Sequence, residues 1–339
     1  MKSGKMTLLL AFTLAFVQSQ AQNPSIKLLE SGKRVSLRGL SVVNDNTIWV
    51  SGSNGSVAIS INGGKNFTWI SIPGYEKRDF RDIEAFDENT AIIMAVDEPA
   101  IILKTIDGGK NWKKVFEDNN KGMFLDAMDF ADAKHGMVIG DPIGDEIYGA
   151  NTNDGGETWE KWKNPIKVKE TGEAFFASSG TNLVHSKQGL FFVSGGKQSN
   201  LYQLADGIME PIPVIKGGSS TGANSIAYSN ANRKGMIVGG DFSKDTISSS
   251  NAVLFQYTKK HISFTIPNTP PHGYRSCVIY LDENTLLTCG TSGMDISKDG
   301  GMNWQLIGKE SFHVCQKAKK GTSVFLAGSN GRIAQLINP

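Results

Sequence analysis

The sequence predicts an all-β protein, a seven-bladed β-propeller of four-stranded antiparallel blades. Three observations predict this fold. A turn-forming octet recurs at nearly constant spacing, a strand–turn–strand pattern recurs beside it, and the apolar runs are short and rich in Ile, Val and Leu. Such runs favour strands over helices. We find no convincing amphipathic helix after the first residues, so we expect β-structure throughout.

The octet occurs four times, at 60–67, 105–112, 152–159 and 297–304. Each copy begins with Ser or Thr, has Asn or Asp followed by two glycines, and ends in an aromatic residue. The Asn or Asp positions are 62, 107, 154 and 299, so they are separated by 45, 47 and 145 residues. The last gap is about three periods, which predicts two degenerate repeats inside it.

The composition of the octet is that of a tight hairpin turn. Asn and Asp side chains accept hydrogen bonds from backbone N–H groups just ahead of them. Glycine supplies the positive φ that such a turn needs. The terminal aromatic residue gives each copy a large apolar anchor, so we expect Trp112, Trp159 and Trp304 to be largely buried in equivalent places.

A second pattern accompanies the octets at 37–52, 80–95 and 275–290, where two apolar runs flank a turn of the type Asn/Asp-Asp/Glu-Asn-Thr. Together the patterns divide the chain into seven units of strand-rich sequence. The units span approximately 34–70, 80–116, 124–162, 173–213, 223–265, 274–307 and 312–337. The seventh unit is short by one strand, which residues 25–30 can supply. That strand would close the ring and remove an open sheet edge.

The first 21 residues read as a signal peptide rather than as part of the fold. Lys2 and Lys5 precede an uncharged apolar stretch at 6–17, and Ser19-Gln20-Ala21 offers small residues at a cleavage site. The stretch is shorter than the about 20 residues of a membrane span. We therefore expect an exported chain, periplasmic or secreted, whose residues 22–339 form one propeller domain.

Charge and cysteine content exclude several kinds of function. Lys2 and Lys5 are the only charged residues of the first segment, so 33 of the 35 Lys and Arg residues remain against 33 Asp and Glu. A nearly neutral chain gives no bulk attraction for nucleic acid. The three cysteines, Cys277, Cys289 and Cys315, include no C-x-x-C pair, so no metal site is predicted. We expect Cys277 and Cys289 to lie nearly opposite each other, and free thiols rather than a disulfide.

These octets resemble the Asp box, or BNR repeat, which sialidases share with many noncatalytic propellers. Over residues 25–337 the chain also resembles the photosystem II assembly-factor-like propellers. That resemblance implies an exported seven-bladed protein that helps to assemble or stabilise other proteins. The resemblance is specific for the fold and not for the function, because one fold hosts many unrelated activities.

A candidate binding surface follows from propeller geometry. The innermost strands begin on one face of the ring, where loops from all blades surround the mouth of the axial channel. Polar residues gather at these positions in the sequence. The residues that we assign to this surface are Arg38, Arg81, Asp82, Asp126, Asp141, Glu173, Asp241, Arg275 and His313.

Three interpretations of this surface are open. Exposed loops are polar in most proteins, and these charges can simply pair with one another. Alternatively, the arginines bind carboxylates of a protein or glycan partner in two-point fashion. The third interpretation is a sialidase-like glycoside hydrolase acting on an anionic glycan. Resemblance to that class implies Arg38, Arg81 and Arg275 as substrate arginines, Tyr274 as nucleophile, Glu173 as its base and Asp82 as acid, but no Arg-Ile-Pro segment lies near the first unit.

The sequence favours a noncatalytic binding protein, with the hydrolase as the alternative. No cofactor is predicted, because no glycine-rich loop stands at a strand-to-helix junction and the five histidines show no ligand spacing. We expect a monomer with a protein or glycan partner at the channel mouth.

Overall fold

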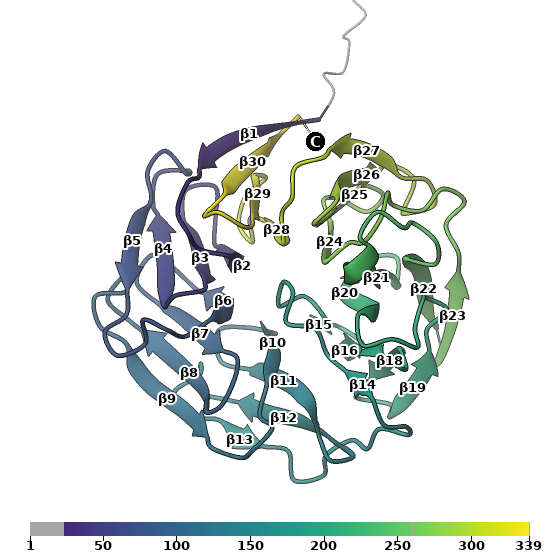
Figure 1. The fold of residues 1–339 in the computed structure, drawn as a ribbon, viewed down its shortest axis with the longest axis horizontal. Helices are drawn as coiled ribbons and strands as arrows, with labels where there is room; N and C mark the ends of the chain where they lie inside the picture. The colour runs from purple at the N-terminus through teal and green to yellow at the C-terminus, as the bar shows by residue number, and fades with distance from the viewer. Residues whose placement is uncertain (1–23, 259, 339) are drawn as a thin grey trace, which may run out of the picture.

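The computed structural model describes residues 24–258 and 260–338, which form a ring of seven β-sheets around a central axis (Figure 1). The first three blades are regular four-stranded antiparallel sheets. Blade 1 comprises β2 (Leu37–Val42), β3 (Ile48–Gly52), β4 (Ser56–Ser60) and β5 (Thr68–Ser71). Blade 2 comprises β6 (Phe80–Ala85), β7 (Ala91–Ala95), β8 (Ala100–Thr105) and β9 (Lys113–Asp118). Blade 3 comprises β10 (Leu125–Phe130), β11 (Gly136–Ile143), β12 (Glu146–Thr152) and β13 (Glu160–Lys161).

The next three blades complete most of the circle. Blade 4 comprises β15 (Leu183–Ser186), β16 (Gly189–Val193), β18 (Asn200–Gln203) and β19 (Ile208–Pro211). Blade 5 comprises β20 (Thr221–Ser229), β21 (Lys234–Asp241), β22 (Ala252–Thr258) and β23 (His261–Thr265), with the short 3-10 helix η1 (Phe242–Lys244) after β21. Blade 6 comprises β24 (Cys277–Tyr280), β25 (Leu286–Gly290), β26 (Gly293–Ser297) and β27 (Gln305–Gly308).

Blade 7 joins the two ends of the chain. Its inner strands β28 (Val314–Lys317), β29 (Val324–Ala327) and β30 (Ile333–Ile337) are followed by β1 (Ser25–Glu30) as the outermost strand. The antiparallel pairing of β1 with β30 runs from Ser25 opposite Ile337 to Glu30 opposite Ile333. The prediction that an N-terminal strand closes the ring is therefore confirmed, and the seven blades follow the predicted units closely.

Blade 4 departs from the regular pattern at the place where an innermost strand should begin. Two residues there form β14 (Glu173–Ala174), which pairs with β17 (Gly195–Gly196) and through it extends the sheet of blade 5 to six strands. The chain then leaves β-structure and resumes it only at β15. Figure 1 shows this intervening segment reaching toward the centre of the ring.

The four octets all form the predicted turn between the third and fourth strands of a blade. In each, the opening Ser or Thr hydroxyl accepts a hydrogen bond from the second glycine N–H at 2.8–3.0 Å. The Asn or Asp carboxamide or carboxylate accepts one from the N–H four residues ahead at 2.9–3.1 Å. Both glycines of every octet have positive φ. The first glycine N–H of each octet donates to a carbonyl of the turn between the first and second strands, so the octet is fixed both by its own side chains and by the neighbouring turn of the blade.

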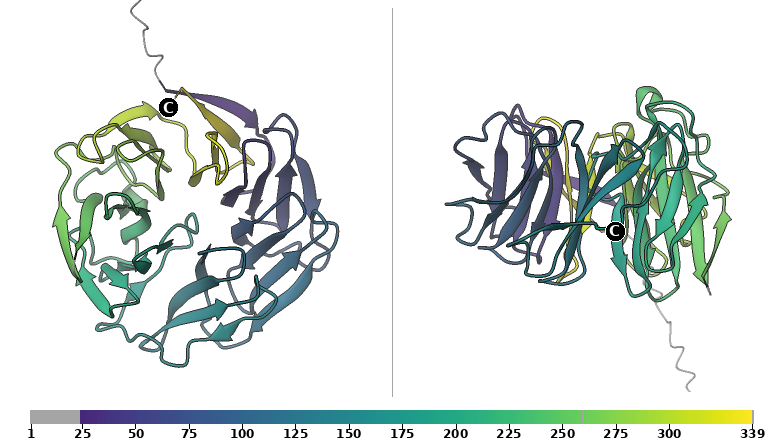
Figure 2. Two further views of the ribbon diagram at one scale, coloured as in Figure 1. Left: turned by 180° about the vertical axis from the view of Figure 1, so that it is seen from behind. Right: turned by 90° about the horizontal axis from the view of Figure 1, so that it is seen from below.

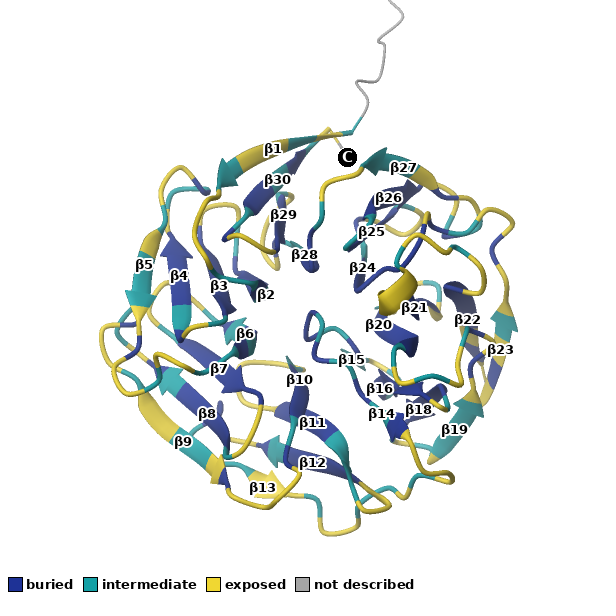
Figure 3. Ribbon diagram, in the orientation of Figure 1, coloured by how far each residue is buried: buried dark blue, intermediate teal, exposed yellow. Residues whose placement is uncertain are grey.

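The apolar core is divided among the interfaces between neighbouring blades. Inner strands are buried and outermost strands largely exposed, as Figure 3 shows. At the interface of blades 1 and 2, Trp49 meets Trp112 edge-on with ring centroids 6.5 Å apart. Of the three octet tryptophans, Trp304 is buried as predicted. Trp112 and Trp159 are only half-buried, although both pack against the apolar clusters between blades.

The expected signal peptide at residues 1–21 lies outside the described residues. Within the described part of the chain, no helix has the length and apolar character needed to cross a membrane.

Candidate functional site

A segment of blade 4 occupies the axial channel. We call residues 175–182, which connect β14 to β15, the plug. The segment contains Phe175, Phe176, two serines and Gly180, and its glycine lies at φ +69. A side chain at Gly180 would meet the Asp82 carboxylate, with 2.3 Å between the added Cβ and Asp82 Cγ. The plug therefore fits against blade 2 only because this position lacks a side chain.

Hydrogen bonds attach the plug to blades on several sides of the ring. Arg38 of blade 1 donates from Nη1 to the Ser178 carbonyl at 3.1 Å. Asp141 of blade 3 accepts the Phe175 N–H at 2.7 Å. The Ser179 hydroxyl donates to the carbonyl of Ser276, next to blade 6, at 2.7 Å. Because these partners come from separate blades, the plug is fixed across the channel rather than lying on one wall.

A hollow of about 330 Å³ lies at the channel mouth against the plug. The side view in Figure 2 shows the ring as a disc with two faces, and this hollow opens where the innermost strands begin. The lining residues are Arg38, Arg81, Phe175, Phe176, Ala177, Ser178, Phe242, Tyr274, Thr291 and His313. Three of the predicted site residues, Arg38, Arg81 and His313, thus share one concave surface, which we call the mouth hollow.

The two arginines give the mouth hollow its positive charge. Arg38 is half-buried and forms no ion pair among the described residues. Burial lowers the pKa of Arg38, and the charge of Arg81 lowers it further; an arginine remains protonated at neutral pH all the same. Arg81 donates from Nε to Asp79 Oδ2 at 2.8 Å and lies over the ring of Phe124 at 5.8 Å. Both guanidinium groups retain N–H donors for a ligand.

Aromatic side chains form the other half of the hollow. Phe242, at the start of η1, is 48% exposed, and Figure 3 shows η1 as an exposed segment beside the central opening. Its ring packs edge-on to Phe176 at 5.8 Å and to Tyr274 at 6.3 Å. Sequence reasoning missed Phe176 and Phe242. Two features of the sequence point to them: Phe176 is one of two adjacent phenylalanines in the irregular inner strand, and Phe242 directly follows Asp241, which was predicted to lie in a loop of the mouth.

His313 contributes a neutral group to the hollow. Burial lowers its pKa to about 3, with further lowering from the charges of Arg38, Arg81 and Arg332. Its Nε2 lies 2.8 Å from Ser329 Oγ and 3.3 Å from Ser36 Oγ. At neutral pH this imidazole is therefore uncharged, and it does not add to the positive charge of the arginines.

Asp126 and Asp141 lie beside the hollow, and burial raises the pKa of both carboxyl groups. Burial raises the pKa of Asp141 to about 6, although the hydrogen bond from Phe175 N–H lowers it. Asp126 is completely buried, and burial raises its pKa well above the usual range; the charge of Asp141 raises it further, whereas Arg81 lowers it. A protonated Asp126 leaves more of the arginine charge uncompensated.

Asp82 lies on the far side of the plug from the mouth. It lines a second cavity of about 280 Å³ together with Ser179, Gly180 and Thr181. Its carboxylate accepts the N–H of Met128 at 2.7 Å and of Ile83 at 2.8 Å. Burial raises the pKa of Asp82 well above its ordinary value despite these hydrogen bonds. Asp82 thus supports the plug rather than the mouth hollow.

Glu173 and Asp241 are engaged in holding local structure. Glu173 is buried, and its Oε1 accepts hydrogen bonds from Tyr202 at 2.6 Å, from Asn200 at 3.0 Å and from the Ser194 hydroxyl. Asp241 caps η1, where its Oδ1 accepts the Ser243 N–H at 3.0 Å; the Ser243 and Ser220 hydroxyls also donate to this carboxylate and lower its pKa. Asp241 therefore positions the helix that carries Phe242.

Arg275 requires a correction, because the sequence places it among the ligand-facing arginines and the structure does not. Its side chain is 0% exposed and forms a buried ion pair with Asp295, with 2.7 Å between Nε and Oδ2. Its Nη1 donates to the carbonyl of Tyr274 and to Ser292 Oγ, both at 2.8 Å. All of its hydrogen-bonding nitrogens are thus used inside blade 6 and its entry loop.

The residues that a sialidase-like centre would need do not come together. Arg38 and Arg81 share the mouth hollow, but Arg275 is buried beside Asp295. The Tyr274 hydroxyl donates to Asn224 Oδ1 at 2.8 Å, and burial raises its pKa to about 12. Glu173 bonds a different tyrosine, Tyr202. Neither the three-arginine group nor the Tyr–Glu pair of that mechanism is formed by these residues.

The ring, the plug and the mouth hollow define a seven-bladed β-propeller with a segment of blade 4 inside its channel. Solved structures share this architecture. The chain superimposes on YCF48 from Cyanidioschyzon merolae with a TM-score of 0.67 and 15% identity, covering 91% of this chain and 98% of that one. A structure of YCF48 bound to D1 peptide gives a TM-score of 0.64 at 15% identity, covering 92% of this chain and 95% of that one.

The WD40 domain of Neurospora crassa Pan2 is a further match, with a TM-score of 0.60, 15% identity and 89% coverage of both chains. At this identity the likeness shows the fold alone. No protein-family model matches the chain, and no curated protein sequence matches it.

Proposed function

We propose that this chain is a noncatalytic scaffold that binds a segment of a partner protein in the mouth hollow. The observation that carries the proposal is the meeting of two arginines with exposed aromatic surface in one hollow. Guanidinium groups bind carboxylates in two-point geometry, and aromatic rings supply large contact area. A peptide with an acidic group next to an apolar side chain would therefore match both the arginine side and the aromatic side of the mouth hollow.

The rigidity of the hollow favours binding. Its floor is a plug held from separate blades, and Arg38 is oriented by its hydrogen bond to Ser178. A preformed site loses less conformational entropy when a ligand docks. The solved propeller of the same fold that holds the D1 peptide supports a peptide as the kind of ligand. On this proposal the chain holds part of a client protein during its assembly or maturation.

The test is affinity selection of short peptides from a random library by the purified chain, followed by fluorescence anisotropy with the selected peptides. Selected peptides should carry a side-chain or terminal carboxylate beside an aromatic or aliphatic residue. The double variant Arg38→Ala, Arg81→Ala should lower affinity at least about tenfold, which corresponds to about 1.4 kcal/mol. Phe242→Ala should lower the affinity of peptides with an apolar residue by a smaller factor.

Lys110→Ala is the matched control. It removes an exposed cation from an octet turn between the third and fourth strands of blade 2, away from the mouth hollow, and should leave affinity unchanged. Equal affinity of the folded double variant and the unaltered chain, or a loss confined to Lys110→Ala, would place the site elsewhere. Release of sialic acid from a fluorogenic sialoside by the pure chain would overturn the noncatalytic part of the proposal.

We also propose that the chain is exported. The support is the sequence of the first residues, with Lys2 and Lys5 ahead of an apolar stretch and a small-residue cleavage site. N-terminal sequencing of protein made in its native cell should begin near Gln22. A native protein that retains Lys2 and fractionates with cytoplasmic markers would contradict this.

A further inference from the structure

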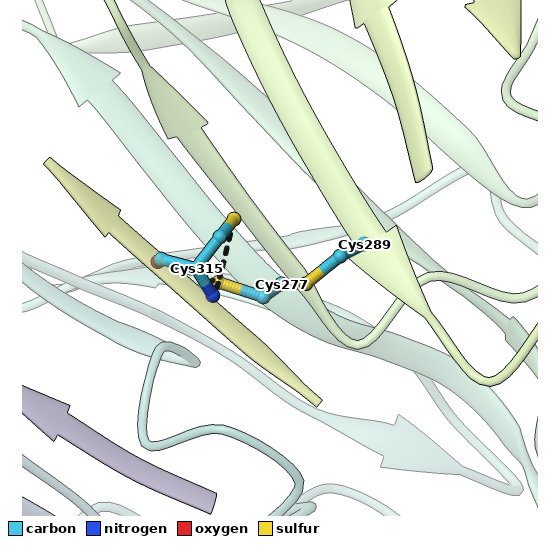
Figure 4. A group of neighbouring side chains, drawn as sticks. All are labelled: Cys277, Cys289 and Cys315. Carbon is cyan, nitrogen blue, oxygen red and sulfur yellow. Dashed lines mark hydrogen bonds between the residues drawn. The ribbon is translucent and has the colours of Figure 1, made fainter. Parts of the chain in front are cut away.

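Three thiols gather where blade 6 meets blade 7. Cys277 lies in β24, Cys289 in the neighbouring β25, and Cys315 in the innermost strand of blade 7 (Figure 4). All three side chains are 0% exposed, and their sulfur atoms lie within 4.8 Å of one another. The Sγ atoms of Cys277 and Cys315 are 3.6 Å apart. None of these cysteines lines the mouth hollow, so the cluster is a separate feature.

The cluster continues a row of sulfur atoms across blade 6. Cys277 is the register partner of Cys289, as predicted, and Cys289 is in turn the partner of Met294. Directly opposed residues on neighbouring strands share one face of the sheet. This face packs into the apolar core shared by blades 1, 6 and 7, in which Met294 is also fully buried. The thiols thus have soft, water-free surroundings.

Cys277 Sγ both donates and accepts, since its thiol lies 3.3 Å from the Cys315 carbonyl oxygen, to which it donates. The backbone N–H of Cys315 donates to Cys277 Sγ at 3.4 Å, and the Cys315 thiol points at the same atom. The thiols are free, since the 3.6 Å separation is far longer than the about 2.05 Å of a disulfide. A single buried cysteine behaves as a small apolar residue. Three in mutual contact across two blades form a preassembled set of sulfur ligands.

We propose that Cys277, Cys289 and Cys315 form a binding site for one soft monovalent metal ion, Cu(I). Metal–sulfur bonds of about 2.3 Å would place the sulfurs of a trigonal site about 4 Å apart. The observed cluster is already close to that size. Soft thiolate ligands select Cu(I), whereas structural zinc sites take four ligands in a tetrahedron. The group contains three cysteines and no imidazole or carboxylate ligand.

Binding involves no change of oxidation state. The ion enters and leaves as Cu(I), and every sulfur that binds it as thiolate releases one proton to solvent. The bound ion would join blade 6 to blade 7, the blade in which the N-terminal strand closes the ring. An ion held only by the folded chain stabilises it by mass action. Metal binding would therefore stabilise the interface between blade 6 and blade 7, next to the strand pairing that closes the ring.

The test uses the reduced, purified chain under anaerobic conditions, with Cu(I) supplied in competition with a colorimetric Cu(I) chelator. Because the thiols are fully buried, copper is added both to the folded protein and during refolding. We expect one copper per chain after dialysis in at least one of these preparations, with a thermal midpoint several degrees higher. X-ray absorption at the copper edge should show three sulfur neighbours.

Variants separate this site from surface binding. Cys289→Ala and Cys315→Ala should each weaken Cu(I) retention at least tenfold while near-UV circular dichroism stays that of the folded chain. His135→Ala is the matched control, because it removes an exposed imidazole that lies 2.8 Å from an Asp132 oxygen and should change nothing.

The proposal would be overturned if no copper were retained in either preparation, if folded cysteine variants retained as much copper, or if mass spectrometry found an intramolecular disulfide in the native protein. Preferential retention of Zn(II) would also overturn it. Should the cysteine variants fail to fold, the number of sulfur neighbours around copper in the unaltered chain decides, and fewer than three contradicts the site.

Discussion

Blades 1 and 2 differ from blade 4 in how a chain segment of similar length is used. In the first two blades the innermost strand has six residues, and an octet turn joins the outer strands. In blade 4 the innermost strand begins as the two-residue β14, breaks for the plug, and resumes as the four-residue β15. No octet stands at the corresponding place in the sequence. The regular blades form the wall of the ring, whereas blade 4 also sends its plug segment into the channel.

This difference shows where a propeller can vary without losing its fold. Each regular blade is stabilised by hydrogen bonds among its own strands and turns and by apolar packing against the neighbouring blades. An inner strand that breaks exposes polar backbone groups to the channel. The plug satisfies them with partners from other blades, such as Asp141 and Arg38. The candidate site therefore arises where the repeat fails.

The largest expected effect concerns the regular blades. Trp304→Ala should lower the free energy of unfolding by about 3–5 kcal/mol, because the indole is buried and its Nε1 donates to the Gly301 carbonyl at 2.9 Å. Trp112→Ala, at the equivalent octet position but half-buried, should lower it by less. Urea unfolding of both variants measures the difference. Equal losses would mean that burial at the interface does not decide the contribution of the octet tryptophan.

A smaller effect is expected from the plug. Gly180→Ala places a Cβ against the Asp82 carboxylate at a backbone φ of +69, so it should lower the free energy of unfolding by about 1–3 kcal/mol and weaken peptide binding. Gly144→Ala is the matched control, with φ +70 and nothing within 4 Å of the added Cβ. It has the backbone strain of a positive φ without a steric contact, so it should lower stability by about 1–2 kcal/mol and by less than Gly180→Ala. Identical behaviour of the two variants would show that the plug does not need its contact with blade 2.

The smallest effect is a pH dependence at the anchor of the plug. The pKa of Asp141 is raised from 3.8 to about 6, so its contribution to stability is fully present below about pH 4 and is lost as the pH rises through 6. His313 has the opposite effect. Its pKa is lowered to about 3, so its contribution to stability is present above pH 6.5 and is lost as the pH falls toward 3. The variant Asp141→Asn removes the pH-dependent contribution of Asp141 and leaves that of His313.

Urea unfolding between about pH 4 and pH 7 should therefore give a smaller decline, or a rise, in stability with pH for Asp141→Asn than for the unaltered chain. The plots of the two proteins should converge at the acid end, where Asp141 is protonated. Parallel plots over the whole range would show that Asp141 does not titrate within the fold.

The aromatic residues of the mouth can be seen in the sequence, but their place beside the plug could not be predicted from it, for the same reason as the plug itself. The segment at 173–182 looks like an inner strand, since Phe175 and Phe176 are apolar and the spacing matches the other units. What removes it from the sheet is the set of contacts with Asp141, Arg38 and Ser276, which are far away along the chain. No local pattern records such contacts.

Arg275 is a second example of a residue whose surroundings could not be predicted from local sequence. The sequence assigns it to the channel-mouth surface although it is offset by one residue from Arg38 and Arg81 in their repeats, and in the structure it is buried and paired with Asp295 on β26. The register of Cys277 with Cys289 was predictable because a short turn fixes which residues face each other. The approach of Cys315 depends on how blade 7 packs on blade 6.

The sequence by itself determined the ring: the octet turns, the seven units and the N-terminal strand that closes them. Each of these rests on interactions within a few residues or on the period of the repeat, such as the bond from Asn111 N–H to Asp107. Only the tertiary structure decided what fills the ring, which arginines remain free and where the sulfur atoms meet. Those features depend on side chains from different blades converging at one point, and convergence is set by packing across the whole ring.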